Sequence, residues 1–173
     1  QISLWLQQGQ PVRIAVNLSA QQLRQSNLVQ LVRDALERYQ VPAQWLELEV
    51  TESQAMQDPD HACRMLAELA GLGVSLALDD FGNGHSSLAY LQHLPVQRLK
   101  LGKDFMRTGR LGSRLLGAMI QFGHALNLQV VAEGVETEVQ RSQLEAMGCE
   151  CYQGWLASKA MTALEFETWR NQR

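Results

Sequence analysis

Short β-rich runs alternate along this chain with longer segments in which apolar residues recur at helical spacing. We expect strands at residues 12–17, 46–50, 74–78, 98–101, 129–132 and 151–153. We expect helices over residues 28–39, 62–70, 86–93, 111–126 and 137–147 and from 162 to the end, with a polar loop over 51–60. Such alternation is typical of βα units around a parallel sheet.

The same periodicity predicts which side of each element is buried. The helix over 28–39 carries one apolar stripe, formed by Leu28, Leu31, Val32, Ala35, Leu36 and Tyr39. The inward-facing residues of the helix over 111–126 are expected to be Leu115, Leu116, Met119, Ile120, Gly123 and Leu126. The run 74–78 is almost continuously apolar, as in a strand that is buried on both faces.

Polar or charged residues stand at or just after the end of nearly every expected strand. These residues are Asn17, Glu49, Glu52, Asp79, Asp80, Lys100, Glu133, Glu136 and Gln153. A doubly wound sheet usually gathers its ligand groups near one switch point, whereas a (β/α)8 barrel draws them from the carboxyl ends of many strands. The pattern therefore favours a TIM-like barrel.

The length modifies this expectation. The chain has 173 residues, whereas a (β/α)8 barrel has typically about 250 and at least about 200. Residues 2–6, followed by Gly9 and Pro11, resemble the last turns of a helix. We therefore expect one domain over residues 1–173, an α/β fold that is a TIM-like (β/α)8 barrel without its first strand and first helix.

Composition and charge narrow the class of protein. Hydrophobic residues make up 46% and charged residues 19%, which argues against a disordered chain or a coiled coil. The net charge of −3 offers no basic surface for duplex DNA or RNA. Three cysteines are too few for a disulfide framework, and no apolar run is long enough to span a bilayer. We expect a cytoplasmic domain without membrane contact of its own; upstream segments could anchor a longer protein.

The adjacent carboxylates Asp79 and Asp80 follow a buried strand and precede two glycines. Holding both ionised at such a position is costly unless a cation lies between them. Mg²⁺ or Mn²⁺ prefers hard oxygen ligands, which are the ligands on offer here. Ser86 and Ser87 could cap a helix whose N–H groups suit a phosphate. The plain alternative is a capped loop with solvated aspartates.

The other strand-end residues also have plain structural readings. Asn17 could cap a helix, Glu49 could form an ordinary salt bridge, and Lys100 could be a surface lysine. An inward lysine among carboxylates would instead hold a phosphate or a water. Because these residues occur together at successive strand ends, a shared functional site is favoured over separate structural roles. Trp155 is near enough to Gln153 to border a pocket.

Six sequence blocks resemble, in the same order, those of the EAL domain family, bacterial phosphodiesterases of cyclic di-GMP. The blocks are residues 17–20 (NLSA), 46–53 (LELEVTES), 79–88 around DDFG, 94–100 (LPV and LK), 131–137 (VAEGVET) and 153–159 (QG and SK). The resemblance implies a TIM-like barrel that hydrolyses cyclic di-GMP to linear pGpG with a pair of Mg²⁺ or Mn²⁺ ions. It also implies upstream sensory or GGDEF domains and a possible homodimer.

The resemblance also implies metal ligands. Asn17, Glu49 and Asp79 would bind the first metal ion. Asp79 and Asp80 would share or hold the second, with Glu133 as a ligand or general base.

Three further residues receive roles from the resemblance, and a fourth, Ser86, receives one from its place at the start of an expected helix. Lys100 would orient the attacking water or steady the phosphate. Glu52 would tether the loop after Asp80. Gln153 would complete the network of metal-bound water, and Ser86 would contribute to substrate binding.

Two departures from the family pattern keep an alternative open. The Glu-Ala-Leu motif of the first strand, whose glutamate is a metal ligand, does not occur here, and Gly102 stands where the family usually has aspartate. The alternative is a catalytically inactive EAL-like domain that binds cyclic di-GMP or a partner protein. A third and weaker interpretation is an unrelated metal-dependent aldolase or lyase barrel.

Overall fold

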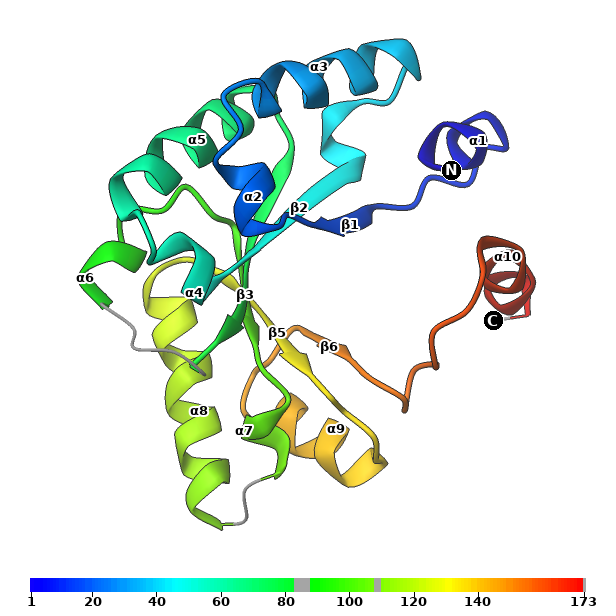
Figure 1. The fold of residues 1–173 in the computed structure, drawn as a ribbon. Coiled ribbons are helices and arrows are strands. Elements are labelled where there is room, and N and C mark those ends of the chain that lie inside the picture. Colours follow the sequence, from blue (N-terminus) through cyan, green and yellow to red (C-terminus); the bar gives the residue numbers. More distant parts are fainter. Residues whose placement is uncertain (83–87, 108–109, 173) are drawn as a thin grey trace.

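Six parallel strands in sequence order form one curled sheet in the computed structural model, which describes residues 1–82, 88–107 and 110–172 (Figure 1). The strands are β1 Ile14–Asn17, β2 Leu46–Thr51, β3 Ser75–Phe81, β4 Arg98–Leu101, β5 Gln129–Glu133 and β6 Cys151–Gln153. Every neighbouring pair is parallel. This arrangement confirms the expected α/β fold, an incomplete TIM-like barrel.

Helices connect the strands and cover the outer side of the sheet (Figure 1). The longer ones are α3 Leu28–Arg38, α5 Pro59–Gly71, α8 Arg110–Ala125, α9 Glu138–Ala146 and α10 Ala163–Asn171. The shorter ones are α1 Ile2–Gln7, α2 Ala20–Leu23, α4 Glu52–Ala55, α6 Leu88–Leu91, α7 Asp104–Arg107 and the 3-10 helix η1 Ala43–Trp45. No helix in these described ranges is both long and apolar enough to cross a membrane.

The sequence periodicity missed most of the one-turn helices, although α6 lies within the helix predicted over 86–93. It predicted a polar loop over residues 51–60, and this is wrong because α4 and the start of α5 lie there. Helices α2 and α7 were also missed. A four-residue helix has too few positions to show an apolar period, so its capping residues are the better signal. Thr51 caps α4 through a capping box with Gln54, and Ser19 caps α2 in the same way.

Alternate residues of the strands point outward into an apolar core. Leu48, Val50, Leu76, Leu78, Leu99, Leu101, Val130 and Ala132 are all at most 3% exposed and belong to one cluster. Helix α8 adds Leu116 and Ile120 to this cluster. The predicted helical stripes were too wide, since Leu31, Tyr39 and Leu115 are 50%, 60% and 50% exposed. Leu31 and Leu115 lie at the borders of their stripes, and Tyr39 is the C-cap that follows the last residue of α3.

The two end helices α1 and α10 lie together, on the open side of the curled sheet (Figure 1). Trp5 Nε1 donates a hydrogen bond of 2.6 Å to Glu167 Oε1, and the rings of Trp5 and Phe166 are 5.2 Å apart. Trp5 is only 5% exposed. The packing of α1 therefore depends on residues more than 160 positions away.

Candidate functional site

The inner side of the sheet carries a row of polar side chains at the carboxyl ends of the strands. Parallel pairing sets Asn17 beside Glu49 and Thr51 beside Asp79. Glu133 is likewise paired with Gln153. Because side chains alternate between the two faces of a strand, one residue in two faces inward. The predicted ligands of successive strands are thus aligned on one face.

Lys100 lies at the centre of this row. Its Nζ is 2.8 Å from Glu49 Oε2, 2.8 Å from Glu133 Oε1 and 3.3 Å from Asp79 Oδ1. Lys100 is 5% exposed and Glu49 is 6% exposed. The four residues come from β2, β3, β4 and β5. The surface-lysine alternative is therefore wrong, and the inward position was correctly predicted.

The electrostatic balance of this cluster is negative, with three carboxylates around one ammonium. Burial by itself would lower the pKa of Lys100, but its hydrogen bonds to Glu133 and Glu49 raise that pKa above the ordinary value for lysine. Burial raises the pKa of Glu49, an effect that its hydrogen bond to Lys100 opposes. Lys100 is thus cationic at neutral pH, and its carboxylate neighbours are incompletely neutralised.

Asp80 takes an uncommon backbone conformation at the end of β3. Its φ is +56°, in the left-handed region that non-glycine residues rarely adopt. The pairing of β3 with β4 shifts register between Leu78 and Phe81, which marks a β-bulge. Within this bulge the Asp80 N–H donates to Asp79 Oδ1 at 2.9 Å. Asp79 is thus half-buried in the row, whereas Asp80, within the bulge, is exposed.

Glu52 holds the turn that follows Asp80. The Gly82 N–H donates a hydrogen bond of 2.9 Å to Glu52 Oε2, and Glu52 is 3% exposed. Gly82 has a φ of +93°, and a Cβ atom there would lie 2.3 Å from Phe105 Cζ. The hydrogen bond from Gly82 to Glu52 matches the tether that the resemblance implied for Glu52. Its effect on catalysis remains a prediction.

A cavity of about 590 Å³ opens beside Glu133. Its lining includes Gln153, Trp155, Lys103 and Lys159. The Lys159 Nζ lies 5.5 Å from the centroid of the Trp155 ring, and the indole is 65% exposed. The prediction that Trp155 borders a pocket is confirmed. The pairing of an exposed aromatic ring with two ammonium groups suits an anionic ligand with flat, stackable parts.

The sequence reading missed Lys103 and Lys159 as lining residues. Lys103 lies just beyond β4, and Lys159 lies beyond β6, so both occupy the loops at the carboxyl edge of the sheet. That position was itself the available signal. The predicted residue Ser86 lies outside the described residues, which resume at Leu88, the first residue of α6.

The donor chemistry of the row fits a hard divalent cation, since its side-chain ligands are carboxylate and amide oxygens. Within the part of the chain that the structure describes, no three acidic, histidine or cysteine residues form a ready-made metal-binding group. Instead, Glu49, Asp79 and Glu133 share the Lys100 ammonium. One ammonium leaves two of the three negative charges uncompensated, which an added cation would offset.

Known proteins resemble this chain over almost its whole length. It is 41% identical over 170 residues to the signaling protein YkoW of Bacillus subtilis, covering 96% of this chain and 21% of the relative. It is 44% identical over 167 residues to the bifunctional diguanylate cyclase/cyclic di-GMP phosphodiesterase MucR of Pseudomonas aeruginosa, covering 94% of this chain and 24% of MucR. The chain therefore spans about a fifth to a quarter of the length of these curated relatives.

Solved structures agree with the sequence relatives. The PaMucR phosphodiesterase in complex with c-di-GMP superposes with a TM-score of 0.90 at 42% identity, over 95% of this chain and 68% of that one. The EAL domain of Mycobacterium smegmatis DcpA has a TM-score of 0.90 at 34% identity, over 99% and 79%. The EAL domain family model matches residues 1–160. The aligned polar row, the incomplete barrel and these matches lead to one conclusion: the chain belongs to the EAL domain family.

Proposed function

We propose that this site hydrolyses one phosphodiester bond of cyclic di-GMP to give linear pGpG. The observation that carries the proposal is the Lys100 ammonium held by Glu49, Asp79 and Glu133 beside a cavity of about 590 Å³. The names of several relatives support the substrate, including the cyclic di-GMP phosphodiesterases NbdA and PdeR. The third interpretation, an unrelated aldolase or lyase barrel, is excluded by the family.

We assign the metal ions to the acidic row. Asn17, Glu49 and Asp79 would hold one Mg²⁺ or Mn²⁺, and Asp79 and Asp80 would hold a second, with Glu133 as a further ligand or general base. Bound divalent ions would lower the pKa of a water and offset charge on the phosphate. The excess of carboxylate over ammonium in the row supports this assignment.

The chain's own residues would perform the remaining steps. In the overall reaction, water adds to one phosphorus atom, one phosphorus–oxygen bond to ribose breaks, and the departing oxygen takes up a proton. Lys100 donates hydrogen bonds that would orient the water or steady the phosphate, and Glu133 would accept the water's proton. Glu52 would hold the turn after Asp80 through the Gly82 amide. Gln153 would complete the hydrogen-bond network around the bound water.

The wider context is part of the same proposal. We expect a longer protein in which sensory or GGDEF domains precede this domain, as the bifunctional name of MucR suggests. We also expect pairing of two copies and action in the cytoplasm. Analytical ultracentrifugation of the longer protein would test the pairing.

The direct test is product formation from cyclic di-GMP by the domain within its full-length protein, followed by chromatography with and without Mg²⁺ or Mn²⁺. We expect metal-stimulated pGpG, and we expect Asp79→Asn to lower turnover at least about 100-fold. The matched control is Asp104→Asn, an exposed aspartate outside the row. Tight nucleotide binding without metal-stimulated product would reject the enzymatic proposal.

A second candidate function is a receptor that binds cyclic di-GMP without hydrolysis. Gly102 favours it, because this buried glycine lies two residues after Lys100 and adds no side chain to the inward row. The variant Gly102→Asp distinguishes the candidates. A receptor would gain hydrolysis only in the variant, whereas an enzyme would already produce pGpG with glycine at this position.

A further inference from the structure

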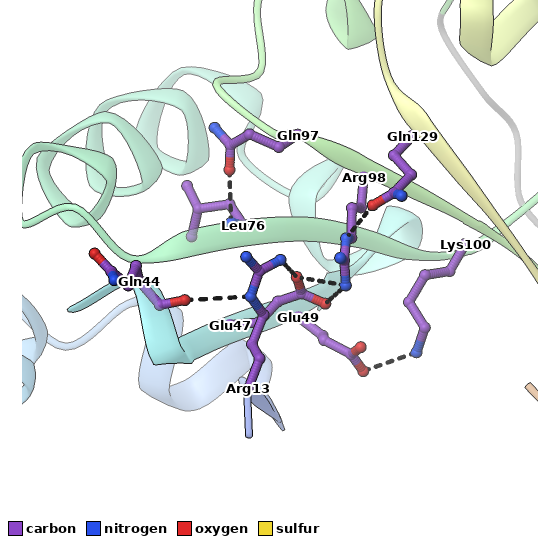
Figure 2. Close-up of polar contacts among 9 residues, drawn as sticks. All are labelled: Arg13, Gln44, Glu47, Glu49, Leu76, Gln97, Arg98, Lys100 and Gln129. Carbon is purple, nitrogen blue, oxygen red and sulfur yellow. Dashed lines mark hydrogen bonds and ion pairs between the residues drawn. The ribbon is translucent and has the colours of Figure 1, made fainter. Parts of the chain in front are cut away.

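A second group of charged residues lies on the same inner face, one layer before the Lys100 row (Figure 2). Glu47 is 3% exposed and accepts a hydrogen bond of 3.2 Å on Oε1 from the Arg98 guanidinium. The same guanidinium nitrogen is 3.0 Å from Glu47 Oε2, and an Arg13 nitrogen is 3.8 Å from that oxygen. We call Arg13, Glu47 and Arg98 the Glu47 cluster.

The Glu47 cluster repeats the geometry of the Lys100 row. Glu47 and Glu49 are two residues apart on β2, and Arg98 and Lys100 are two residues apart on β4. In each pair a cation on β4 meets a glutamate on β2, across the intervening strand β3. Figure 2 shows Arg98 and Lys100 both extending toward the β2 glutamates.

The span across β3 requires a small residue beneath it. Neighbouring strands are about 4.8 Å apart, so β2 and β4 are separated by about 10 Å. Ala77 of β3 is paired with Glu49 on one side and with Arg98 on the other, and it is fully buried. Its methyl group leaves room for both long side chains to cross.

Arg98 is itself held from a further strand. Its Nε donates a hydrogen bond of 2.8 Å to Gln129 Oε1 on β5, and Arg13 Nε donates one of 3.2 Å to the Gln44 carbonyl. The Glu47 cluster thus links β2 to β4. Arg13, just before β1, contacts it on one side, and Gln129 of β5 holds it on the other. The Arg98 side chain is 25% exposed, and its planar guanidinium, held by Glu47 and Gln129 together, has little freedom to move.

We propose that Arg98 and Glu47 are positioning residues that fix the spacing of β4 from β2, across β3, so that Lys100 stays among its carboxylates. The inference rests on the proposed function only for what Lys100 does once it is placed. Lysine has a flexible stem and a strongly hydrated head, so its confinement requires the flanking strands to keep their spacing. The Glu47 cluster supplies that constraint one layer away.

Competitive labelling of lysine amines by trace acetic anhydride tests this placement without relying on catalysis. The chain has only three lysines, and Lys103 and Lys159 are exposed whereas Lys100 is 5% exposed. Mass spectrometry of the folded protein reports the labelling of Lys100 relative to the other two. The test variants are the isosteric Glu47→Gln and the double variant Glu47→Gln with Arg98→Met, which leaves no buried charge without its partner.

We expect relative labelling of Lys100 to rise about fivefold or more in the double variant, and by less in Glu47→Gln, which retains the shape of the side chain. Arg98→Lys, which keeps a cation, should preserve part of the protection. The control is Leu144→Ala in α9, a destabilising change at a 2% exposed core residue outside the inner face. Each variant is labelled at a temperature equally far below its own melting point. Under that condition, Leu144→Ala should leave Lys100 protected from labelling.

Two results would overturn the proposal. One is unchanged Lys100 labelling in both Glu47 variants. The other is an equal rise in Leu144→Ala, which would show that general loosening exposes Lys100. If the protein has no hydrolase activity, the labelling result still decides the placement. If it has activity, we expect the double variant to lower kcat with little change in KM, as for a residue that positions another.

Discussion

Lys100 Nζ lies 2.8 Å from Glu49 Oε2, although 51 positions separate the two residues in the sequence. Neither side chain is appreciably exposed, and the pair crosses the strand that lies between β2 and β4. Both partners would be costly to bury alone. The site therefore depends on the sheet's register as much as on the identity of its residues.

Replacing Lys100 by methionine should destabilise the fold at neutral pH. Three carboxylates would then face one another without the ammonium, so we expect a loss of about 3 kcal/mol in the free energy of unfolding at pH near 7.5. Urea denaturation followed by circular dichroism measures this loss. Lys103→Met, at an exposed position, is the matched control and should change stability little.

The loss in Lys100→Met should shrink in acid. Without the ammonium, nothing opposes the effect of burial, so the folded-state pKa of Glu49 rises further above its unfolded value; the native state then binds more protons and its stability grows as pH falls. In the wild type, the raised pKa of Glu49 also makes stability grow as pH falls, but Lys100 reduces this effect because its hydrogen bond lowers the pKa of Glu49. The raised pKa of Lys100 keeps its contribution until pH rises above the ordinary value of 10.5. An equal deficit at about pH 5 and about pH 7.5 would contradict this explanation.

Glu52→Ala should release the turn after Asp80. The Gly82 amide would lose its 2.9 Å acceptor, which costs roughly 1–3 kcal/mol if the amide finds no other partner. Amide hydrogen exchange at Gly82 should quicken by at least about tenfold. Glu52→Gln retains an acceptor oxygen and should show a smaller increase. Equal exchange rates in wild type and Glu52→Ala would rule out the tether.

Gly154→Ala should be strongly destabilising. A Cβ atom at Gly154 would lie 2.1 Å from the carbonyl oxygen of Val135 and 2.4 Å from its nitrogen. Backbone atoms cannot move aside as a flexible side chain can, so we expect a loss of about 3 kcal/mol or more. Gly71→Ala is the control, since nothing lies within 4 Å of its Cβ position. Thermal melts of both variants compare the two sites; similar melting temperatures would contradict the close approach.

Added Mg²⁺ or Mn²⁺ should raise the melting temperature of the wild type. An ion at 100 times its dissociation constant stabilises the native state by about 2.7 kcal/mol. Asp79→Asn should reduce the shift, because it removes an anionic ligand shared by both proposed ions. A chelator should reverse it. The same shift in wild type and Asp79→Asn would place the ions elsewhere on the surface.

Much of the fold was readable from local patterns. Strands β4 and β6 have the bounds predicted from the sequence, because apolar residues and turn signals bracket them closely. The end of β3 was predicted wrongly, because the strand does not stop at residue 78 but continues through Asp79 and Asp80 to Phe81. Two adjacent aspartates disfavour a strand, and only the bulge and the neighbouring β4 make the extension possible.

Some residues of the candidate site could likewise be predicted from the sequence, and others could not. The polar residues Asn17, Glu49 and Asp79 could be predicted from the sequence, because each stands at or just after the end of an expected strand. The Glu47 cluster could not, because Glu47 and Arg98 each appear in sequence as ordinary charged residues near a strand start. The buried contact of Glu47 with Arg98 crosses β3, and no local spacing encodes it.

The sequence by itself determined the order of strands and helices, the alternation that turns every second strand residue inward, and the acidic character of the strand ends. These are local properties, set by side-chain period and chemistry. Only the tertiary structure decided that Lys100 is shared by three carboxylates, that the backbone bulges at Asp80, and that Arg98 reaches Glu47. Each of these depends on the register and curvature of strands far apart in the chain, which hydrogen bonds between strands and core packing establish together.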